Sequence, residues 1–231
     1  MFSLVWKDVA AAGRLLWIVL AVGAAQLAGM AFLPSTYVLG VLIFSALLAF
    51  GSLAIEEYQR TELLWISVPV SRAQIVTARY LTTILGAVVG LAIGWAIANW
   101  VARLAPAAAE GPAALLSLEA HVVLLAVLTL AAAVHLPLHF RLGAGRGLMS
   151  FVAISLAGLI VVSLATRLIL SAKGLPSPTT DPAAWRELAV GWIQWAEPRL
   201  ALLLTLLVAF SAAMLAISLV LSTRAYETRD I

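Results

Sequence analysis

The sequence has no cysteine and little charge. Of its 231 residues, 11% are charged and 64% are hydrophobic, and the formal net charge is +3. The lack of cysteine excludes a disulfide framework and a thiolate metal site, and so small a net charge does not indicate nucleic-acid binding. A chain this apolar cannot bury its hydrophobic surface inside a soluble domain. The composition therefore predicts an integral membrane protein.

Six apolar runs are long enough to cross a bilayer, whose hydrocarbon core of about 30 Å needs about 20 helical residues. Their backbone groups must be hydrogen-bonded within each segment, so the runs are expected to be helices. The tripeptide Pro34, Ser35 and Thr36 leaves room only for an antiparallel hairpin between the first two. The sequence thus predicts one all-α transmembrane domain over residues 1–231, with spans at about 15–33, 37–55, 80–101, 120–138, 148–170 and 200–221.

Two flanking segments are amphipathic rather than spanning. Residues 1–14 are expected to form an interfacial elbow helix on the inner surface, and 171–198 an outer loop that carries an amphipathic helix with three tryptophans. Basic residues near the span ends favour cytoplasmic termini. A cleaved signal peptide is the alternative for the first span, but its apolar run continues to Leu33, which favours a retained helix.

The link between the second and third spans is the most polar part of the chain. Glu56 and Glu57 mark where the second span leaves lipid, and a short helix with an apolar patch of leucines around Trp65 follows. Pro69 ends that helix, and Ser71 with Gln74 forms a capping box that opens the next one. An exposed apolar helix at the inner membrane face needs a partner to cover it, either lipid or protein.

The stretch "ELLWISVPVSRAQIVTARYL", residues 62–81, resembles bacterial type-2 ABC-transporter permeases, in which a coupling helix and a "LPVSR" turn precede the third span. The second cytoplasmic loop, "LPLHFRLGAGRG", and the N-terminal "WKD" are similar to that family's pattern. The resemblance implies that ATPase coupling involves Glu56, Glu57, Arg60, Glu62, Leu63, Leu64, Trp65, Pro69, Ser71 and Arg72. In the second loop it implies roles for His139, Phe140, Arg141, Gly143 and Arg146.

The same resemblance implies a six-span exporter subunit of the bacterial inner membrane. The scarcity of ionisable groups within the spans favours an amphipathic or hydrophobic cargo: a lipid, a peptide or a drug. The chain contains no GxxxxGK[ST] motif, so ATP and Mg²⁺ are expected on separate cytoplasmic ATPase subunits and no cofactor on this chain. A second permease chain, identical or related, and membrane lipids are the other expected partners. No catalytic residue is predicted.

Two other classes of protein remain as alternatives. An intramembrane metalloprotease would use Glu56 and Glu57 with His135 and His139, which are one helical turn apart. However, Arg60 stands one residue too close to Glu57 for the glutamate-protease pattern, and Pro137 is expected to disturb the helix face between the histidines. An ion-coupled carrier would need ionisable groups near the bilayer midplane, and very few are found.

Glycines recur at every fourth position of the third span, at Gly86, Gly90 and Gly94. A row of small residues lets another helix approach closely. The partner helix is expected within the same chain or, alternatively, across a dimer interface.

Overall fold

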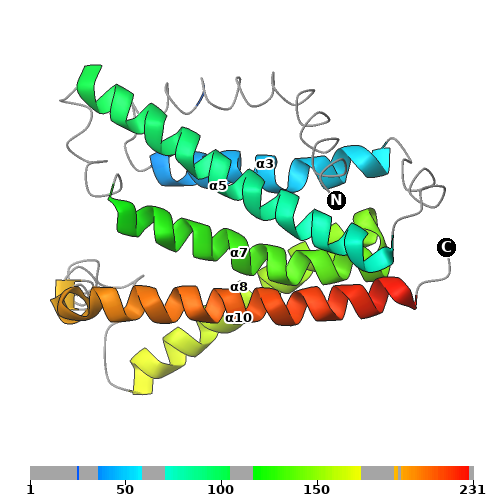
Figure 1. Ribbon diagram of the computed structural model, residues 1–231. Helices are drawn as coiled ribbons and strands as arrows, with labels where there is room; N and C mark the ends of the chain where they lie inside the picture. The colour runs from blue at the N-terminus through cyan, green and yellow to red at the C-terminus, as the bar shows by residue number, and fades with distance from the viewer. Residues whose placement is uncertain are drawn as a thin grey trace.

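A computed structural model describes residues 25, 36–58, 71–104, 117–172, 190–191 and 194–228. These residues form helices and contain no strand, which confirms the predicted all-α class (Figure 1). The elements are α3 (Thr36–Tyr58), α5 (Arg72–Leu104), α7 (Leu118–Leu142), α8 (Ala144–Ala172), the 3-10 turn η3 (Glu197–Arg199) and α10 (Leu200–Glu227).

Among the described residues, four helices are long and apolar enough to cross a membrane: Arg72–Trp100, Leu118–Leu142, Gly145–Ala165 and Gln194–Glu227. These helices contain most of the residues of the last four predicted spans, 80–101, 120–138, 148–170 and 200–221. The predicted span 37–55 lies within α3, whose described apolar stretch, Gly40–Gly51, is shorter than a full span. The predicted span 15–33 falls outside the described residues except for Ala25, as does the elbow helix. The total of six spans therefore stays a prediction.

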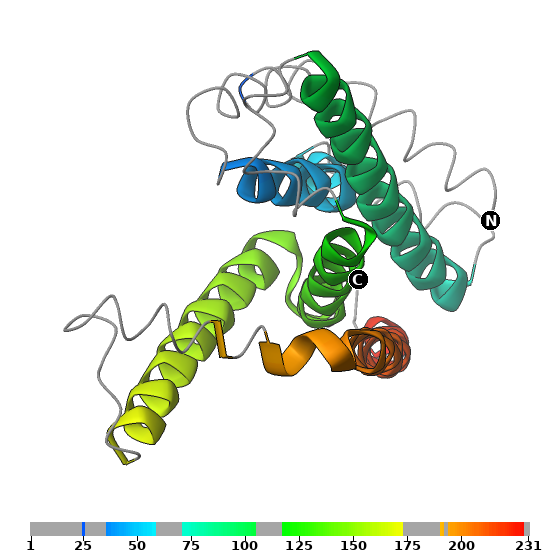
Figure 2. The same ribbon diagram turned by 90° about the vertical axis from the view of Figure 1, so that its left-hand side faces the viewer.

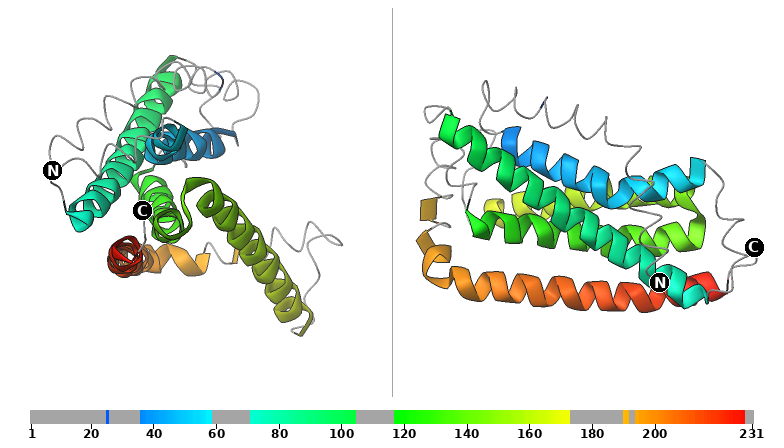
Figure 3. Two further views of the ribbon diagram at one scale, coloured as in Figure 1. Left: turned by 90° about the vertical axis from the view of Figure 1, so that its right-hand side faces the viewer. Right: turned by 45° about the horizontal axis from the view of Figure 1, so that its top comes forward.

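The helices α3, α5, α7 and α10 pack together, whereas α8 diverges from them. Figures 2 and 3 show α8 leaving the bundle beyond its first turns. The side chains of α8 are correspondingly exposed, from Leu148 and Met149 to Leu168. Since exposed apolar side chains are stable in lipid but costly in water, this pattern fits a membrane environment. The short segment that ends in η3 lies across the axis of α10 (Figure 2).

Two apolar clusters hold the bundle. One joins α3, α5 and α7 through residues such as Val41, Leu91 and Leu128. The other brings together all four packed helices, and it consists of Leu53, Ile75, Val76, Ala78, Tyr80, Ala132, Leu136, Phe140 and Tyr226. The second cluster lies where α3, α7 and α10 end and α5 begins, so it supports the end of the bundle to which the predicted functional residues belong.

The prediction that Pro137 disturbs its helix is wrong. The helix α7 runs without interruption from Leu118 to Leu142 with Pro137 inside it. Proline removes the N–H that would bond to the carbonyl of residue 133, and in lipid such a carbonyl needs another donor. The hydroxyl of Ser218 on α10 donates to the oxygen of Ala133 at 2.7 Å. A neighbouring helix therefore replaces the bond that the proline removes.

Candidate functional site

We call one end of the bundle the junction end: the last turns of α3, α7 and α10, and the first turns of α5 and α8 (Figures 1 and 3). Both segments singled out from the sequence reach it. The link after α3 leads into α5 here, and the second predicted cytoplasmic loop joins α7 to α8 here. The second apolar cluster, which includes Leu136 and Phe140, lies at this end of the bundle.

The predicted ATPase-coupling residues fall in three groups. Glu56 and Glu57 belong to the last turn of α3. Ser71 immediately precedes α5, and Arg72 is its first residue. The remaining ones lie outside the described residues: Arg60, Glu62, Leu63, Leu64, Trp65 and Pro69. The structure thus describes the two helices, α3 and α5, that the predicted coupling segment connects.

The start of α5 has the predicted capping box. The side-chain oxygen Oγ of Ser71 accepts from the backbone N–H of Gln74 at 3.3 Å, and Oε1 of Gln74 accepts from the N–H of Ser71 at 3.2 Å. These reciprocal bonds satisfy two donors that a helix start otherwise leaves open. The prediction is confirmed, and α5 continues from this cap as a single helix of 33 residues.

Arg72 connects the start of α5 to the end of α10. Its Nη1 donates to the backbone oxygens of Tyr226 at 3.0 Å and Glu227 at 2.8 Å, and its guanidinium lies 6.0 Å from the centre of the Tyr226 ring. The last carbonyls of a helix lack intrahelical partners and carry partial negative charge, so a cation there is favourable. Arg72, the last of the predicted coupling residues, is therefore bonded to the end of α10.

The second predicted loop is a tight turn. Gly143 separates α7 from α8 with a φ of 81° and donates its N–H to the oxygen of His139 at 2.9 Å. The positive φ favours glycine. Phe140 is buried against Tyr226, with ring centres 5.4 Å apart, whereas Arg141 and Arg146 are exposed. The turn thus presents two cations at the junction end while its aromatic residue packs into the core.

His135 and His139 lie on one face of α7, with ring centres 6.1 Å apart. His135 is buried between Phe50 of α3 and Phe151 of α8, each at slightly more than 5 Å from it: 5.3 Å and 5.2 Å. Within the described part of the chain, no group of three or more His, Cys, Asp or Glu side chains is placed to hold a metal ion. The surroundings of His135 are aromatic, and the ring packs as part of the α3–α7–α8 contact.

The glycine row of α5 faces α3 of the same chain. A Cβ atom added to Gly86 would lie 2.6 Å from the backbone oxygen of Leu48, and one added to Gly90 would lie 2.6 Å from the Cα of Ser45. At Gly94 it would lie 2.9 Å from the side chain of Val41. At Gly86 and Gly90 the two backbones approach so closely that only glycine fits, and at Gly94 the side chain of Val41 would have to shift.

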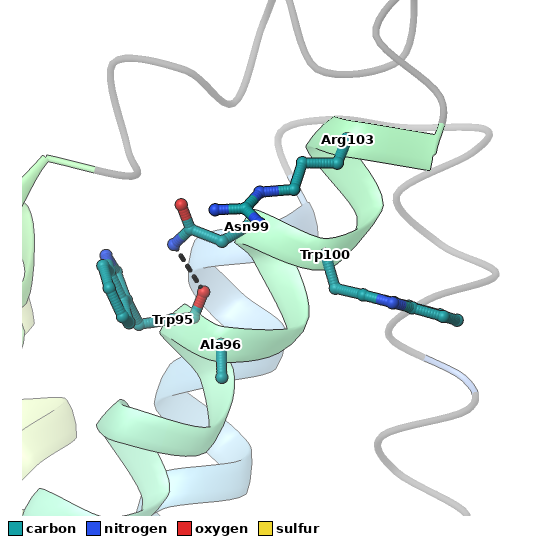
Figure 4. Close-up of a pocket in the computed structure, with 5 residues that line it drawn as sticks. All are labelled: Trp95, Ala96, Asn99, Trp100 and Arg103. Atoms are coloured by element: carbon teal, nitrogen blue, oxygen red, sulfur yellow. Dashed lines mark hydrogen bonds between the residues drawn. The ribbon is translucent and has the colours of Figure 1, made fainter.

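A depression of about 230 Å³ lies at the opposite end of α5, lined by Trp95, Ala96, Asn99, Trp100 and Arg103 (Figure 4). The amide of Asn99 donates to the backbone oxygen of Trp95 at 2.8 Å, and the side chain of Arg103 extends back toward Asn99. All five lining residues belong to one helix, so the depression is a feature of the α5 surface. Tryptophan and arginine near a span end are typical of a membrane interface.

The decisive comparison covers nearly the whole chain: residues 3–227 match the model of the family described as ABC-2 family transporter protein. The chain belongs to that family. It is accordingly the membrane-spanning component of an ABC transporter, a permease, as the resemblance of residues 62–81 implied. No curated protein and no solved structure matches it.

Three residues at the junction end of this permease are absent from the predicted site. Tyr80 of α5 is buried and bonds to Ser218 and Ser222 of α10. Tyr80 lies within the stretch of residues 62–81 but was not singled out there, and neither serine lies in a segment singled out from the sequence. The spacing of the serines was the available signal, because Ser211, Ser218 and Ser222 repeat on one face of an otherwise apolar helix.

Proposed function

We propose that this permease subunit belongs to an ATP-driven exporter and that a separate ATPase moves it through the segment from Glu56 to Arg72. The observation that carries the proposal is the attachment of both ends of this segment. It leaves α3 at Tyr58 and enters α5 at a capped start, whose Arg72 is bonded to the end of α10. When the ATPase displaces a segment attached in this way, whole helices move with it rather than a loop alone.

We propose the following coupling step. ATP and Mg²⁺ on the ATPase subunits drive their closure, which shifts a groove that holds the apolar face of Leu63, Leu64 and Trp65. We propose that Pro69 and Ser71 pass this motion to α5, because proline restricts the backbone there. Arg141 and Arg146, which are exposed beside the turn between α7 and α8, provide a further contact for the ATPase. The junction end is then cytoplasmic, in the inner membrane of a bacterium, with both termini on that side.

The cargo is proposed to be amphipathic or hydrophobic. The exposed faces of α8 and α10 carry leucine, valine and isoleucine with few ionisable groups, which suits a lipid, an apolar peptide or a drug better than a charged metabolite. Two permease chains, identical or related, would be needed to enclose a path, because α8 leaves the bundle of a single chain (Figure 3).

Co-expression with the ATPase encoded beside this chain tests the coupling. The ATPase is expected to co-purify with the parent permease and to be lost on Leu64→Arg or Trp65→Arg, because a charge would be forced into the apolar groove. Trp100→Arg is the matched control, since it makes the same change at the opposite, exposed end of α5. Absence of the ATPase from the parent preparation, or its retention by all three variants, would contradict the proposal.

Reconstitution tests the cargo. In liposomes that contain the permease and its ATPase, lipids or apolar peptides are expected to raise ATP turnover, whereas charged metabolites are not. Accumulation of the stimulating compound on the side away from the ATPase would establish outward transport. Stimulation by charged metabolites alone would contradict the proposed cargo class.

A further inference from the structure

The last helix is attached to the bundle mainly by polar side chains. The buried residues of α10 are Ser211, Ser218, Ser222 and Tyr226, all on one face. Leu215 and Leu219 are half-buried beside them, and the other faces of α10 are largely exposed. In lipid the hydrophobic effect does not drive helices together, so close packing and hydrogen bonds determine which helices stay associated.

The hydroxyls of Tyr80, Ser218 and Ser222 form a chain whose direction can be deduced. The Tyr80 oxygen lies 2.5 Å from Oγ of Ser218 and 2.7 Å from Oγ of Ser222. Ser218 donates its single proton to the oxygen of Ala133, so Tyr80 must donate to Ser218. Tyr80 has then used its own proton, and Ser222 must donate to Tyr80. The order is Ser222, Tyr80, Ser218, Ala133.

This chain ends at the carbonyl that Pro137 leaves without its helical donor. It therefore links α10, α5 and the proline-containing turn of α7 in one continuous set of bonds, each polarising the next. Water is scarce in such an environment and cannot readily substitute for a lost partner. Displacement of Tyr80 relative to α10 would thus leave Ser218 without the hydrogen bond that it accepts and Ser222 without its acceptor.

We propose that Tyr80 and Ser218 are positioning residues that transmit the movement of α5 to α10 and to the proline turn of α7. The inference rests on the proposed function, because that function supplies the movement of α5. Arg72 holds the same two helices together at the junction end, and the hydroxyl chain holds them two turns further in. The two contacts make α5 and α10 move as one body with respect to α8.

Spin-label distances can test this directly, because the chain has no cysteine to remove. One pair of cysteines, Leu81→Cys with Met149→Cys, reports α5 against α8. A second pair, Leu221→Cys with Met149→Cys, reports α10 against α8. All three positions are exposed, so labels can be attached without disturbing the packed face. Distances are measured with the ATPase bound, without nucleotide and with ATP trapped by vanadate.

Both pairs are expected to change distance in the parent. Tyr80→Phe removes both hydroxyl bonds from α5 to α10, and Ser218→Ala removes one of them together with the bond to Ala133. In both variants the α5 pair should still change and the change in the α10 pair should become smaller, while the ATPase stays bound. Ser211→Ala is the matched control, since this serine is equally buried on α10 but its hydroxyl donates to Leu207 of its own helix. It should behave as the parent does.

The outcomes separate the two proposals. An unchanged response of the α10 pair in both hydroxyl variants, or a lost response of the α5 pair in them, would overturn the transmission role while leaving the exporter function intact. An ATPase that does not bind the parent, or that binds without changing either distance, would overturn the proposed function and the transmission with it.

Discussion

Helix α5 holds two of its neighbours, α3 and α10, in different ways. Toward α3 it offers glycines, and the backbones approach until a single Cβ atom would collide. Toward α10 it offers the hydroxyl of Tyr80, which bonds to serines one helical turn apart. The first contact is steric and fixes the distance between two backbones. The second is directional, so it fixes register, and its bonds can be broken one at a time without a clash.

The steric contact should give the largest effect when broken. Gly90→Leu would place a side chain against the backbone of Ser45, so α3 must move away from α5. We expect a loss of about 3 kcal/mol in the free energy of unfolding, at the upper end for overpacked sites. Denaturant-induced unfolding in detergent micelles measures it.

Gly158→Leu is the control for that variant. Gly158 lies in α8, where a Cβ atom would meet nothing within 4 Å, so the same change should alter stability by no more than about 0.5 kcal/mol. Equal destabilisation by the two substitutions would show that the glycines of α5 are not special, and that the α3 contact tolerates side chains.

The directional contact should give a smaller effect that depends on Pro137. Ser218→Ala leaves the oxygen of Ala133 without its donor, and we expect a cost of about 1.5 kcal/mol. In a Pro137→Ala background residue 137 regains an N–H that bonds to Ala133, so the same change should cost roughly 0.5 kcal/mol. The difference of about 1 kcal/mol is the coupling energy of this double-mutant cycle.

If Ser218→Ala costs the same in the parent chain and in the Pro137→Ala background, the result contradicts the structure, because Ser218 would then act independently of the proline. Ser211→Ala supplies the baseline, because its hydroxyl bonds only within α10. Its cost should be the same in the parent chain and in the Pro137→Ala background.

The contrast also explains what could be predicted from the sequence. Apolar run lengths predicted the four long helices, and the Ser71 and Gln74 spacing predicted the start of α5 within one residue. These features are local, so composition and capping chemistry determine them. The glycine row predicted a close helix contact, although its partner was left open between α3 and a second chain.

The hydroxyl chain could not be predicted in the same way. Its members are 138 and 142 residues apart in the sequence, and neither a tyrosine nor a serine identifies its partner by type. The prediction about Pro137 was wrong for the same reason. The rule for proline considers a single helix, whereas here Ser218 of another helix supplies the missing hydrogen bond. Local patterns locate helices, and contacts between helices require the fold.

The capping box should give the next smaller effect. Ser71→Ala removes the acceptor for the N–H of Gln74, and we expect a cost of about 1 kcal/mol in stability. Ser71→Asp keeps an acceptor and should restore most of it. Circular dichroism with thermal unfolding compares the variants, and a loss in Ser71→Asp as large as in Ser71→Ala would show that capping is not the cause.

Arg72→Met should have the smallest effect and the most local one. It removes the cation from the last carbonyls of α10 but keeps most of the side-chain length, so we expect a cost of about 0.5 kcal/mol. Hydrogen exchange of the amides near Tyr226 should become faster by roughly twofold. Arg141→Met, an exposed change at the end of α7, should leave those amides unaltered. Faster exchange in both variants would mean that net charge at the junction end, rather than the bond from α5, holds the end of α10.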